Sequence, residues 1–260
     1  MRARAVVRAA AGGRGTALTE LRAEAPLGLY PGRADVDGWA QVWLVGSAGG
    51  PLGGDDLELR IEVGDGAALS IGSVAASVAL AGPAPSMTRV HAVVGHGAAL
   101  SWNPEPLIVT GRADHRVEVR LDVAADADVW WRDVLALGRT GEEPGRATVA
   151  LRADRAGRPW VRHEIGVGVP GFDGPAVLGP ARVVGSVLAS ADPGVPGRPA
   201  ERGLAELRPE AGGSITVALA ADRPALDRSL AVRALVARPL PAGLCPPSPQ
   251  PRSRHVAVSR

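Results

Sequence analysis

Five charged side chains stand where their neighbours restrict their direction or remove them from water. Asp55 ends a glycine-rich loop, Glu105 lies between two prolines, and Asp133 comes shortly after two consecutive tryptophans. Arg139 and Glu142 lie in a Gly-Arg-Thr-Gly-Glu turn. Because proline fixes its own backbone and restricts the residue before it, an acid held in this way points in a defined direction. Carboxylates presented singly can contact a divalent cation, a partner protein or a nearby arginine.

An ordinary structural explanation also exists for these residues. Asp55 is suited to accept hydrogen bonds within its own turn. Asp133 and Arg139 carry opposite charges and can pair with each other. Ion-pair networks perturb charged residues as functional sites do, so the sequence leaves both explanations open.

The residue types that most often support catalysis or metal binding form no recognisable motif. The five histidines make no H-x-x-x-H or H-E-x-x-H pair, and His91 and His96, which flank a turn, are expected to be exposed. The single cysteine, Cys245, lies in a proline-rich stretch. There is no G-x-S-x-G elbow, Walker loop or dinucleotide-binding glycine motif. We therefore predict that the protein is not an enzyme.

A nine-residue repeat indicates the elements that position the charged side chains. Residues 63–71 read VGDGAALSI, residues 94–102 read VGHGAALSW, and a weaker echo follows at 123–131. Repetition at a fixed period is typical of one supersecondary unit stacked on itself. Each copy reads as the end of a strand, a tight Gly-x-Gly turn and a new strand. The repeat therefore predicts a stack of short strands, like a β-helix or solenoid.

Alternation of apolar and charged residues marks the clearest strands. Residues 57–63 and 117–123 each place four aliphatic side chains on one face and three charged ones on the other. A helix is predicted to start near Asp222, because an acid shortly before a proline is typical of a helix start, although residues 229–236 would also suit a strand. Further strands are predicted at 2–8, 40–45, 67–71, 89–94, 98–102, 148–152 and 214–220. The predicted fold class is all-β, with one or two short helices.

Two segments are expected to lack regular structure. Residues 166–200 are rich in glycine and proline and are predicted to be mostly loop. From Pro239 the chain reads PLPAGLCPPSPQPRSR, a composition that favours disorder. We therefore divide the chain into a single β domain at 1–238 and a disordered Pro/Arg-rich tail at 239–260.

Composition and charge restrict the class of partner. All 29 basic residues are arginines. Seven of them lie in residues 1–19 and 251–260, which contain no acid, so the net charge of +2 corresponds to −5 for residues 20–250. A nucleic-acid-binding face needs a basic stripe with interleaved aromatic residues, and the body of the chain has none. No apolar run suits a membrane span and no secretory signal is recognisable. We predict a cytoplasmic protein that binds neither nucleic acid nor membrane.

Three motifs occur in a characteristic order along the chain. They are GGxLxGD at residues 49–55, WxPxPxI at residues 102–108 and GRxGE at residues 138–142. Each motif alone is unspecific, but the ordered series resembles the urease accessory protein UreD family, also called UreH. The resemblance covers residues 13–165 well and the remainder loosely.

The resemblance implies a chaperone with a β-helix-like scaffold and no catalytic activity. Proteins of this family bind the urease apoprotein, recruit UreF and through it the GTPase UreG, and assist nickel insertion into the urease active site. The resemblance also implies an internal passage for transient Ni2+, with no tightly bound cofactor. Asp55, Asp133 and Glu142 match acids of the family motifs. We assign them, with Arg139 and Glu105, to the nickel path or to a partner interface.

Two other classes of function remain open. A β-solenoid hydrolase or lyase needs acids from successive coils that meet in one groove. Asp65 and Asp126 occupy equivalent places in the first and third repeats, but His96 takes that place in the second. A β-rich structural or adhesion module is the other alternative, and it is expected to carry a secretory signal.

Overall fold

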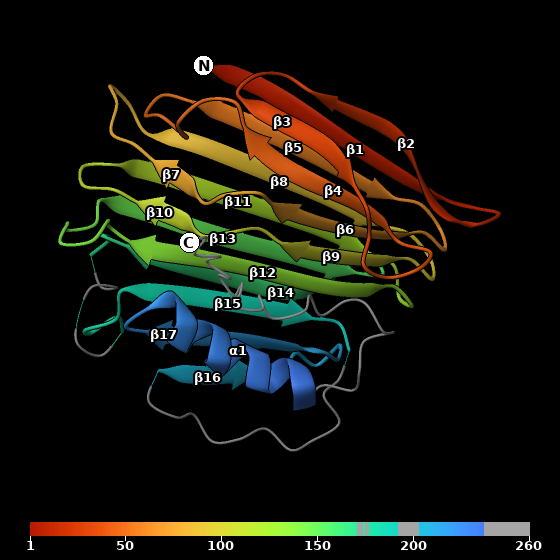
Figure 1. The fold of residues 1–260 in the computed structure, drawn as a ribbon. Coiled ribbons are helices and arrows are strands. Elements are labelled where there is room, and N and C mark those ends of the chain that lie inside the picture. The colour runs from red at the N-terminus through yellow and green to blue at the C-terminus, as the bar shows by residue number, and fades with distance from the viewer. Residues whose placement is uncertain (171–173, 175–176, 192–202, 237–260) are drawn as a thin grey trace, which may run out of the picture.

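The protein is built from two β-sheets that face each other across a shared apolar core (Figure 1). The computed structural model describes residues 1–170, 174, 177–191 and 203–236, with the last six as backbone only. In sheet A the strand order is β14-β13-β11-β8-β5-β1-β2, and in sheet B it is β16-β17-β15-β12-β9-β6-β4-β3. Two further short strands, β7 and β10, pair with each other, and β10 also pairs with β12. The predicted all-β, solenoid-like fold class is confirmed.

The strands of sheet A, in spatial order, are β14 (Arg158–Val167), β13 (Arg146–Arg155), β11 (Asp114–Val123), β8 (Ser86–Val94), β5 (Asp56–Val63), β1 (Arg2–Gly12) and β2 (Gly15–Ala23). Those of sheet B are β16 (Leu204–Leu207), β17 (Ser214–Ala220), β15 (Val183–Ala189), β12 (Asp128–Leu137), β9 (Ala99–Asn103), β6 (Ala68–Ser73), β4 (Ala40–Gly46) and β3 (Leu27–Gly32). The short strands are β7 (Ser77–Ala79) and β10 (Leu107–Val109), and the helix is α1 (Arg223–Val236).

The coil of the chain explains the sequence repeat. After β5 the chain turns into β6 of sheet B, passes through β7 and returns to sheet A as β8. Strand β8 pairs parallel to β5 with Val90 opposite Leu59, and β11 pairs parallel to β8 with Val119 opposite Val90. One repeat therefore corresponds to one coil. The central strands of each sheet are parallel, and antiparallel strands such as β2, β14 and β3 flank them.

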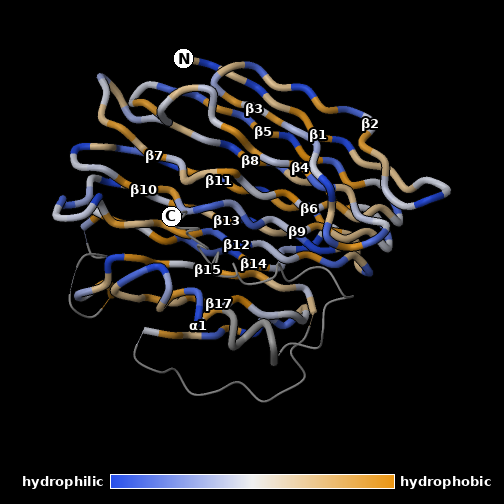
Figure 2. The backbone as a smooth tube through the Cα atoms, viewed as in Figure 1, coloured by the Kyte–Doolittle hydropathy of each residue, from blue (hydrophilic) through white to orange (hydrophobic). Residues whose placement is uncertain are grey.

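The core consists of rows of aliphatic side chains that each coil contributes at the same height. Ile61, Ala92, Leu121 and Ala153 occupy successive positions of one row, and all four are fully buried. Large and small side chains alternate along this row, so each fills the space that its neighbour leaves. The predicted alternation is visible as alternating hydrophilic and hydrophobic residues along the strands (Figure 2). In sheet B the indole ring of Trp102 stacks on that of Trp131 in the next coil, with ring centroids 4.6 Å apart.

The corners of the coils are joined by the residues at the centre of the repeat. A carboxylate oxygen of Asp65 accepts the backbone N–H of His96 at 2.8 Å, and His96 Nδ1 lies 3.1 Å from a carboxylate oxygen of Asp126. Gly66 and Gly97 adopt positive φ angles of 68° and 58°, as the predicted tight turns require. His96 is exposed as expected, whereas His91 lies on β8 and pairs with a carboxylate of β11. Asp65, His96 and Asp126 occupy the positions at which the hydrolase alternative needs a row of acids. In the structure these residues link one turn to the next.

The structure corrects one prediction about secondary structure and confirms another. Residues 183–189, inside the expected loop, form β15, whose residues are all buried. Strand β15 was missed because it is covered on both faces, so its sequence lacks the alternation of apolar and polar residues that marks the other strands. Helix α1 starts as predicted, and Asp222 accepts the N–H of Ala225 at 2.8 Å. The predicted tail at 239–260 lies outside the described residues, so the domain division stays a prediction.

In the part of the chain that the structure describes, no helix combines the length and the apolar character needed to cross a membrane. The expectation of a protein that does not bind membranes is otherwise untested, and so is the expectation that it does not bind nucleic acid.

The loop that carries Asp55 depends on a close approach of two glycines. Gly53 N–H donates to the carbonyl of Leu80 at 3.0 Å, and a Cβ on Gly53 would overlap the backbone of Gly82. We expect Gly53→Ala to lower the free energy of unfolding by about 1–3 kcal/mol, because the added methyl forces the two turns apart. Urea denaturation of Gly49→Ala serves as the control, since a Cβ there has no neighbour within 4 Å. Equal midpoints for the two variants would contradict the prediction.

Candidate functional site

Asp133 is an acid placed between the two sheets. It lies on β12 between Trp131 and Leu135, both of which point into the core, so alternation directs its side chain inward as well. One carboxylate oxygen accepts the indole N–H of Trp131 at 2.8 Å, and the other accepts that of Trp102 at 3.3 Å. The two indole rings stack on each other with an interplanar angle of 8°. A stacked pair of tryptophans from successive coils thus holds the carboxylate in place.

The surroundings of Asp133 change its acidity. Burial raises the pKa of Asp133 to about 6, and the hydrogen bonds from Trp131 and Trp102 oppose that rise in pKa. The carboxyl group is therefore half protonated near pH 6 and largely ionised above pH 7. Such a group can exchange a proton for a cation close to physiological pH.

A cavity of about 10 Å³ lies next to Asp133, with room for about one water molecule. His163 of β14 lines the same cavity, and its buried Nε2 atom has no hydrogen-bond partner among the residues that the structure describes. Burial lowers the pKa of His163, so the ring is neutral at pH 7 and can accept a proton or bind a metal ion. The other walls of the cavity are mostly aliphatic, with Leu135, Val149, Leu151, Ile165, Val184, Gly185 and Ser186.

The pair formed by Asp133 and His163 combines a carboxylate with an imidazole, the donors that borderline divalent cations such as Ni2+ accept. Among the described residues no group of three or more His, Cys, Asp or Glu side chains is arranged to hold a metal ion. The cavity between the sheets is therefore lined by two potential donor side chains.

His163 was missed by the sequence analysis, which searched for histidines in pairs. A usable signal was present: Val161, His163, Ile165 and Val167 alternate along β14, so a histidine takes the place of an aliphatic residue on an inward face. No sequence pattern could show that this face lies opposite β12 of the other sheet.

Asp55 lies just before β5 and accepts hydrogen bonds within its own loop, as the ordinary explanation predicted. One carboxylate oxygen accepts the N–H of Leu52 at 2.9 Å, and the other pairs with the N-terminal ammonium of Met1 at 2.8 Å. Burial alone would raise the pKa of Asp55, but these two partners more than offset it and the pKa lies below its ordinary value. The carboxylate is therefore ionised at neutral pH.

His115 is a second buried histidine that the sequence analysis did not select. Its Nδ1 lies 2.8 Å from Ser86 Oγ at the start of β8. Burial lowers the pKa of His115 to about 4, although the negative charge of Asp55 opposes the change. At neutral pH this ring is uncharged.

Glu142 fastens one loop to another. Its carboxylate accepts the N–H of Gly111 at 2.9 Å and that of Arg139 at 3.1 Å, and these N–H groups lower the pKa of Glu142. Its backbone carbonyl accepts a hydrogen bond from Arg182 at 2.6 Å. Arg139 itself is exposed, and within the described structure the carboxylate of Asp133 is bonded to indole N–H groups and not to Arg139. The suggested Asp133–Arg139 pair is therefore wrong, because Asp133 points inward and is bonded to indoles.

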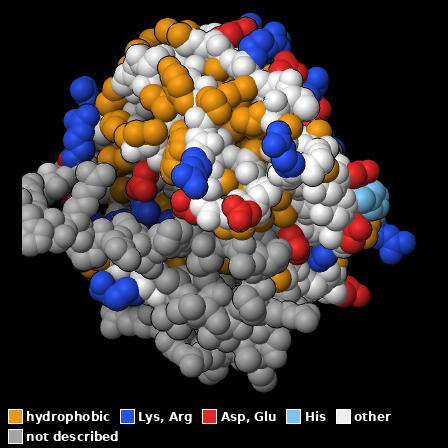
Figure 3. Space-filling model, turned by 45° about the vertical axis from the view of Figure 1, so that its right-hand side comes forward, with side chains coloured by type: hydrophobic (Ala, Val, Ile, Leu, Met, Phe, Trp, Pro, Cys, Tyr) orange, Lys and Arg blue, Asp and Glu red, His pale blue; other side chains and the backbone are white. Residues whose placement is uncertain are grey.

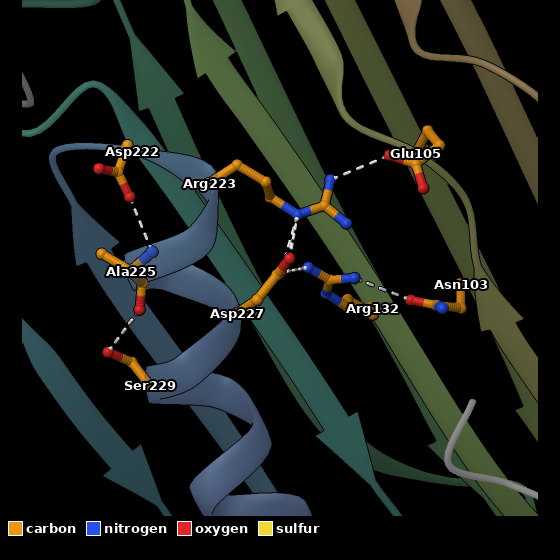
Figure 4. A network of polar contacts seen from close by, with 8 residues as sticks. All are labelled: Asn103, Glu105, Arg132, Asp222, Arg223, Ala225, Asp227 and Ser229. Atoms are coloured by element: carbon orange, nitrogen blue, oxygen red, sulfur yellow. Dashed lines mark hydrogen bonds and ion pairs between the residues drawn. The ribbon is translucent and has the colours of Figure 1, made fainter. Parts of the chain in front are cut away.

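Glu105 belongs to a charged network on the outer face of sheet B (Figure 4). Arg223 of α1 pairs with Glu105 at 3.2 Å and with Asp227 at 2.8 Å. Asp227 also pairs with Arg132 of β12, which donates to Asn103 at 3.0 Å. Burial lowers the pKa of Arg132, and the nearby guanidinium of Arg223 lowers it further, against the effect of the acids. The network fastens α1 to the sheet.

The five predicted residues do not form one cluster. Asp133 alone faces the space between the two sheets, beside a histidine that was not predicted, while Asp55 is buried in its own loop. Asp55 and Glu142 lie in loops at the end of sheet A where β5 and β13 begin. Glu105 lies on the outer face of sheet B, and Arg139 is exposed in the turn after β12.

The fold and the interior site define a β-helix-like scaffold protein with a two-donor cavity between its sheets. The sequence profile described as UreD urease accessory protein matches residues 1–242. The chain is 42% identical to the urease accessory protein UreD of Parafrankia sp. (strain EAN1pec), over 94% of this chain and 93% of that protein. It is 39% identical to urease accessory protein UreD 1 of Saccharopolyspora erythraea, over 89% and 93% of the two chains. The chain belongs to the UreD family of urease accessory proteins.

The raised pKa of Asp133 predicts a specific dependence of stability on pH. The folded state binds the proton more tightly than the unfolded state, whose carboxyl titrates near 4, so this contribution to stability is lost as the pH rises from about 4 through about 6. In the unsubstituted chain this contribution lowers the free energy of unfolding by about 2 kcal/mol between pH 4.5 and 7.5, and we expect Asp133→Asn to abolish that part of the pH dependence.

Urea denaturation at both pH values measures this difference. Comparison with the unsubstituted chain is needed because groups with lowered pKa values, such as Asp55, contribute with the opposite sign. Glu210→Gln, at an exposed position, should keep the original pH dependence. The assignment is wrong if Asp133→Asn keeps it too.

The network on α1 predicts a second effect on stability. We expect Asp227→Asn to lower the free energy of unfolding by about 1–3 kcal/mol, because Arg132 loses its charged partner while its side chain stays only 11% exposed. The solvent exposure of Asp227 keeps the loss below that of a fully buried pair. Hydrogen exchange of the α1 amides should accelerate in this variant but not in Arg228→Gln, whose side chain is exposed. Unchanged exchange in Asp227→Asn would contradict a role in fastening the helix.

Proposed function

We propose that this protein is a non-catalytic urease maturation factor. It binds the urease apoprotein together with UreF, engages the GTPase UreG through UreF, and assists insertion of nickel into the urease active site in the cytoplasm. Membership of the UreD family and the similarity to known urease accessory proteins support the link with urease. The two-donor cavity at Asp133 and His163 is the observation that supports a direct role in nickel transfer.

A transfer site must bind its cargo and then release it. A carboxylate oxygen and a neutral imidazole nitrogen suit Ni2+, and two protein donors hold the ion more weakly than a complete ligand set. His163 needs no deprotonation at pH 7, because burial already keeps it neutral. Asp133 exchanges its proton near pH 6, so the affinity of the pair for a cation rises with pH across that range. Ni2+ is therefore cargo that the interior holds transiently.

We assign the other predicted residues to supporting positions. Asp55 and Glu142 lie at one end of sheet A, where we place the entry of the path. The N-terminal ammonium balances the charge of Asp55, so Glu142 supplies the negative potential that a cation first meets there. Arg139, exposed beside Glu142, and Glu105, half-exposed on the outer face of sheet B, are available to a partner protein.

The proposal is tested in cells that carry the cognate urease gene cluster. We expect the double substitution Asp133→Asn with His163→Leu to lower the nickel content and activity of urease about tenfold or more, the loss typical of disturbed metal ligation. The leucine suits the aliphatic lining of the cavity, so the scaffold should persist. Nickel content is measured by elemental analysis of purified urease, and co-purification of UreF and apo-urease reports whether the complex still forms.

Glu210→Gln is the matched control, because it removes an exposed acid and should leave urease activation unchanged. Full nickel loading by the double variant would refute an interior path through Asp133 and His163. Deletion of the whole chain tests the broader role: if urease still matures normally, the maturation function itself is wrong.

A further inference from the structure

Sheet B carries two exposed aromatic rings that no described element covers. Tyr30 of β3 is 58% exposed and Trp43 of β4 is 38% exposed. The two residues are directly opposite each other in the antiparallel pairing of β3 and β4, so their side chains lie on the same face. We call this pair the aromatic platform. Figure 3 shows apolar side chains gathered on the upper part of the molecule, the part that the N-terminal strands occupy in Figure 1.

The rings of the platform lie close to the sheet because glycines are beneath them. A Cβ on Gly72 would stand 2.7 Å from the six-membered ring of Trp43, and a Cβ on Gly32 would overlap its pyrrole edge. A Cβ on Gly28 would stand 3.2 Å from the ring of Tyr30. The aromatic faces are therefore supported from below. Within the described residues the indole N–H of Trp43 donates no hydrogen bond, so this donor is left to water or to a ligand.

This combination of features suits a proline-rich segment. The polyproline II helix has no internal hydrogen bonds, so its carbonyl groups are free to accept from an indole N–H. Its proline rings pack against aromatic side chains, and proline-rich motifs are recognised in this way on aromatic-lined surfaces. An extended, proline-rich ligand thus matches both the rings and the donor of the platform.

The chain itself carries such a segment at residues 239–251. Six of these residues are prolines: Pro239, Pro241, Pro246, Pro247, Pro249 and Pro251. Helix α1, which ends at Val236, leads to this segment from the same outer face of sheet B. Its Leu226 and Leu230 pack with Trp130 and Val134, which point away from the inter-sheet core.

The segment is also long enough to reach the platform. Five strand spacings separate β17 from β4, a distance of about 24 Å. A polyproline II chain rises about 3.1 Å per residue, so roughly eight residues span this distance. Residues 246–251 follow Val236 by ten or more positions. Charge adds to the fit, because the loop between β3 and β4 exposes Asp35 and Asp37 against one arginine, Arg33, whereas residues 251–260 contain arginines and no acid.

We propose that residues 239–251 dock as an extended segment on the aromatic platform of the same chain, with the indole N–H of Trp43 bound to a backbone carbonyl. Docking buries two aromatic rings that would otherwise form part of an exposed apolar surface. The proposal concerns the outer face of sheet B and does not depend on the proposed interior path.

The experiment uses the 15N-labelled full-length chain, in which Trp43→Phe identifies the indole signal of Trp43 by its absence. Native protein is compared with the triple substitution Pro246→Ala, Pro247→Ala and Pro249→Ala. We expect the Trp43 indole signal to shift and its hydrogen exchange with water to accelerate about three- to tenfold in the triple variant, the factor that one hydrogen bond of ordinary strength supplies. Ser253→Ala with Val256→Ala, outside the proline-rich segment, should change neither quantity.

Two results would overturn the proposal. The first is an identical Trp43 signal and exchange rate in the native chain and the triple variant. The second is an effect that disappears on dilution of the protein, which would assign the platform to the tail of a second copy. Equal thermal melting of all variants establishes that the comparison concerns folded protein.

Discussion

Backbone pairing between successive coils is the constraint on which the rest of this structure depends. Each coil must place its strands in register with the coil before it, so that Leu59, Val90 and Val119 stand in one row. At the corner, the carboxylate of Asp65 binds the backbone of the next turn. A coil that slipped by one residue would turn its aliphatic side chains to the solvent. Register therefore determines which side chains face inward.

The same constraint explains why a polar interior site exists. Asp133 must face inward because Trp131 and Leu135 do, and it is tolerated because two indole N–H groups bind its carboxylate. His163 occupies an inward position of β14 for the same reason, with its Nε2 unpaired. An unpaired polar atom in an apolar interior is costly, and this one lies beside the cavity that Asp133 also lines.

The two outer faces of the molecule differ in chemistry. The outer face of sheet A carries pairs of arginine and acid from neighbouring strands, such as Arg8 with Glu62 and Arg116 with Glu164. Exposed pairs of this kind contribute little stability and keep a face hydrated. Sheet B instead carries α1 over β15 and β17 and the aromatic platform on β3 and β4. The face of sheet B is therefore the one suited to contacts with other polypeptide segments.

The sequence by itself determined the class of fold, the strands of the repeat, the start of α1 and the family, because alternation, glycine turns and motif order are local patterns. It selected Asp133 and explained part of the role of Asp55, since each has one hydrogen-bond partner two or three residues away in the chain. It did not reveal β15, whose apolar run has no alternation, or the partnership of Asp133 with His163. That partnership joins opposite sheets through side-chain packing. Only the tertiary structure could decide it, because no local pattern encodes which inward-facing residues meet across a core.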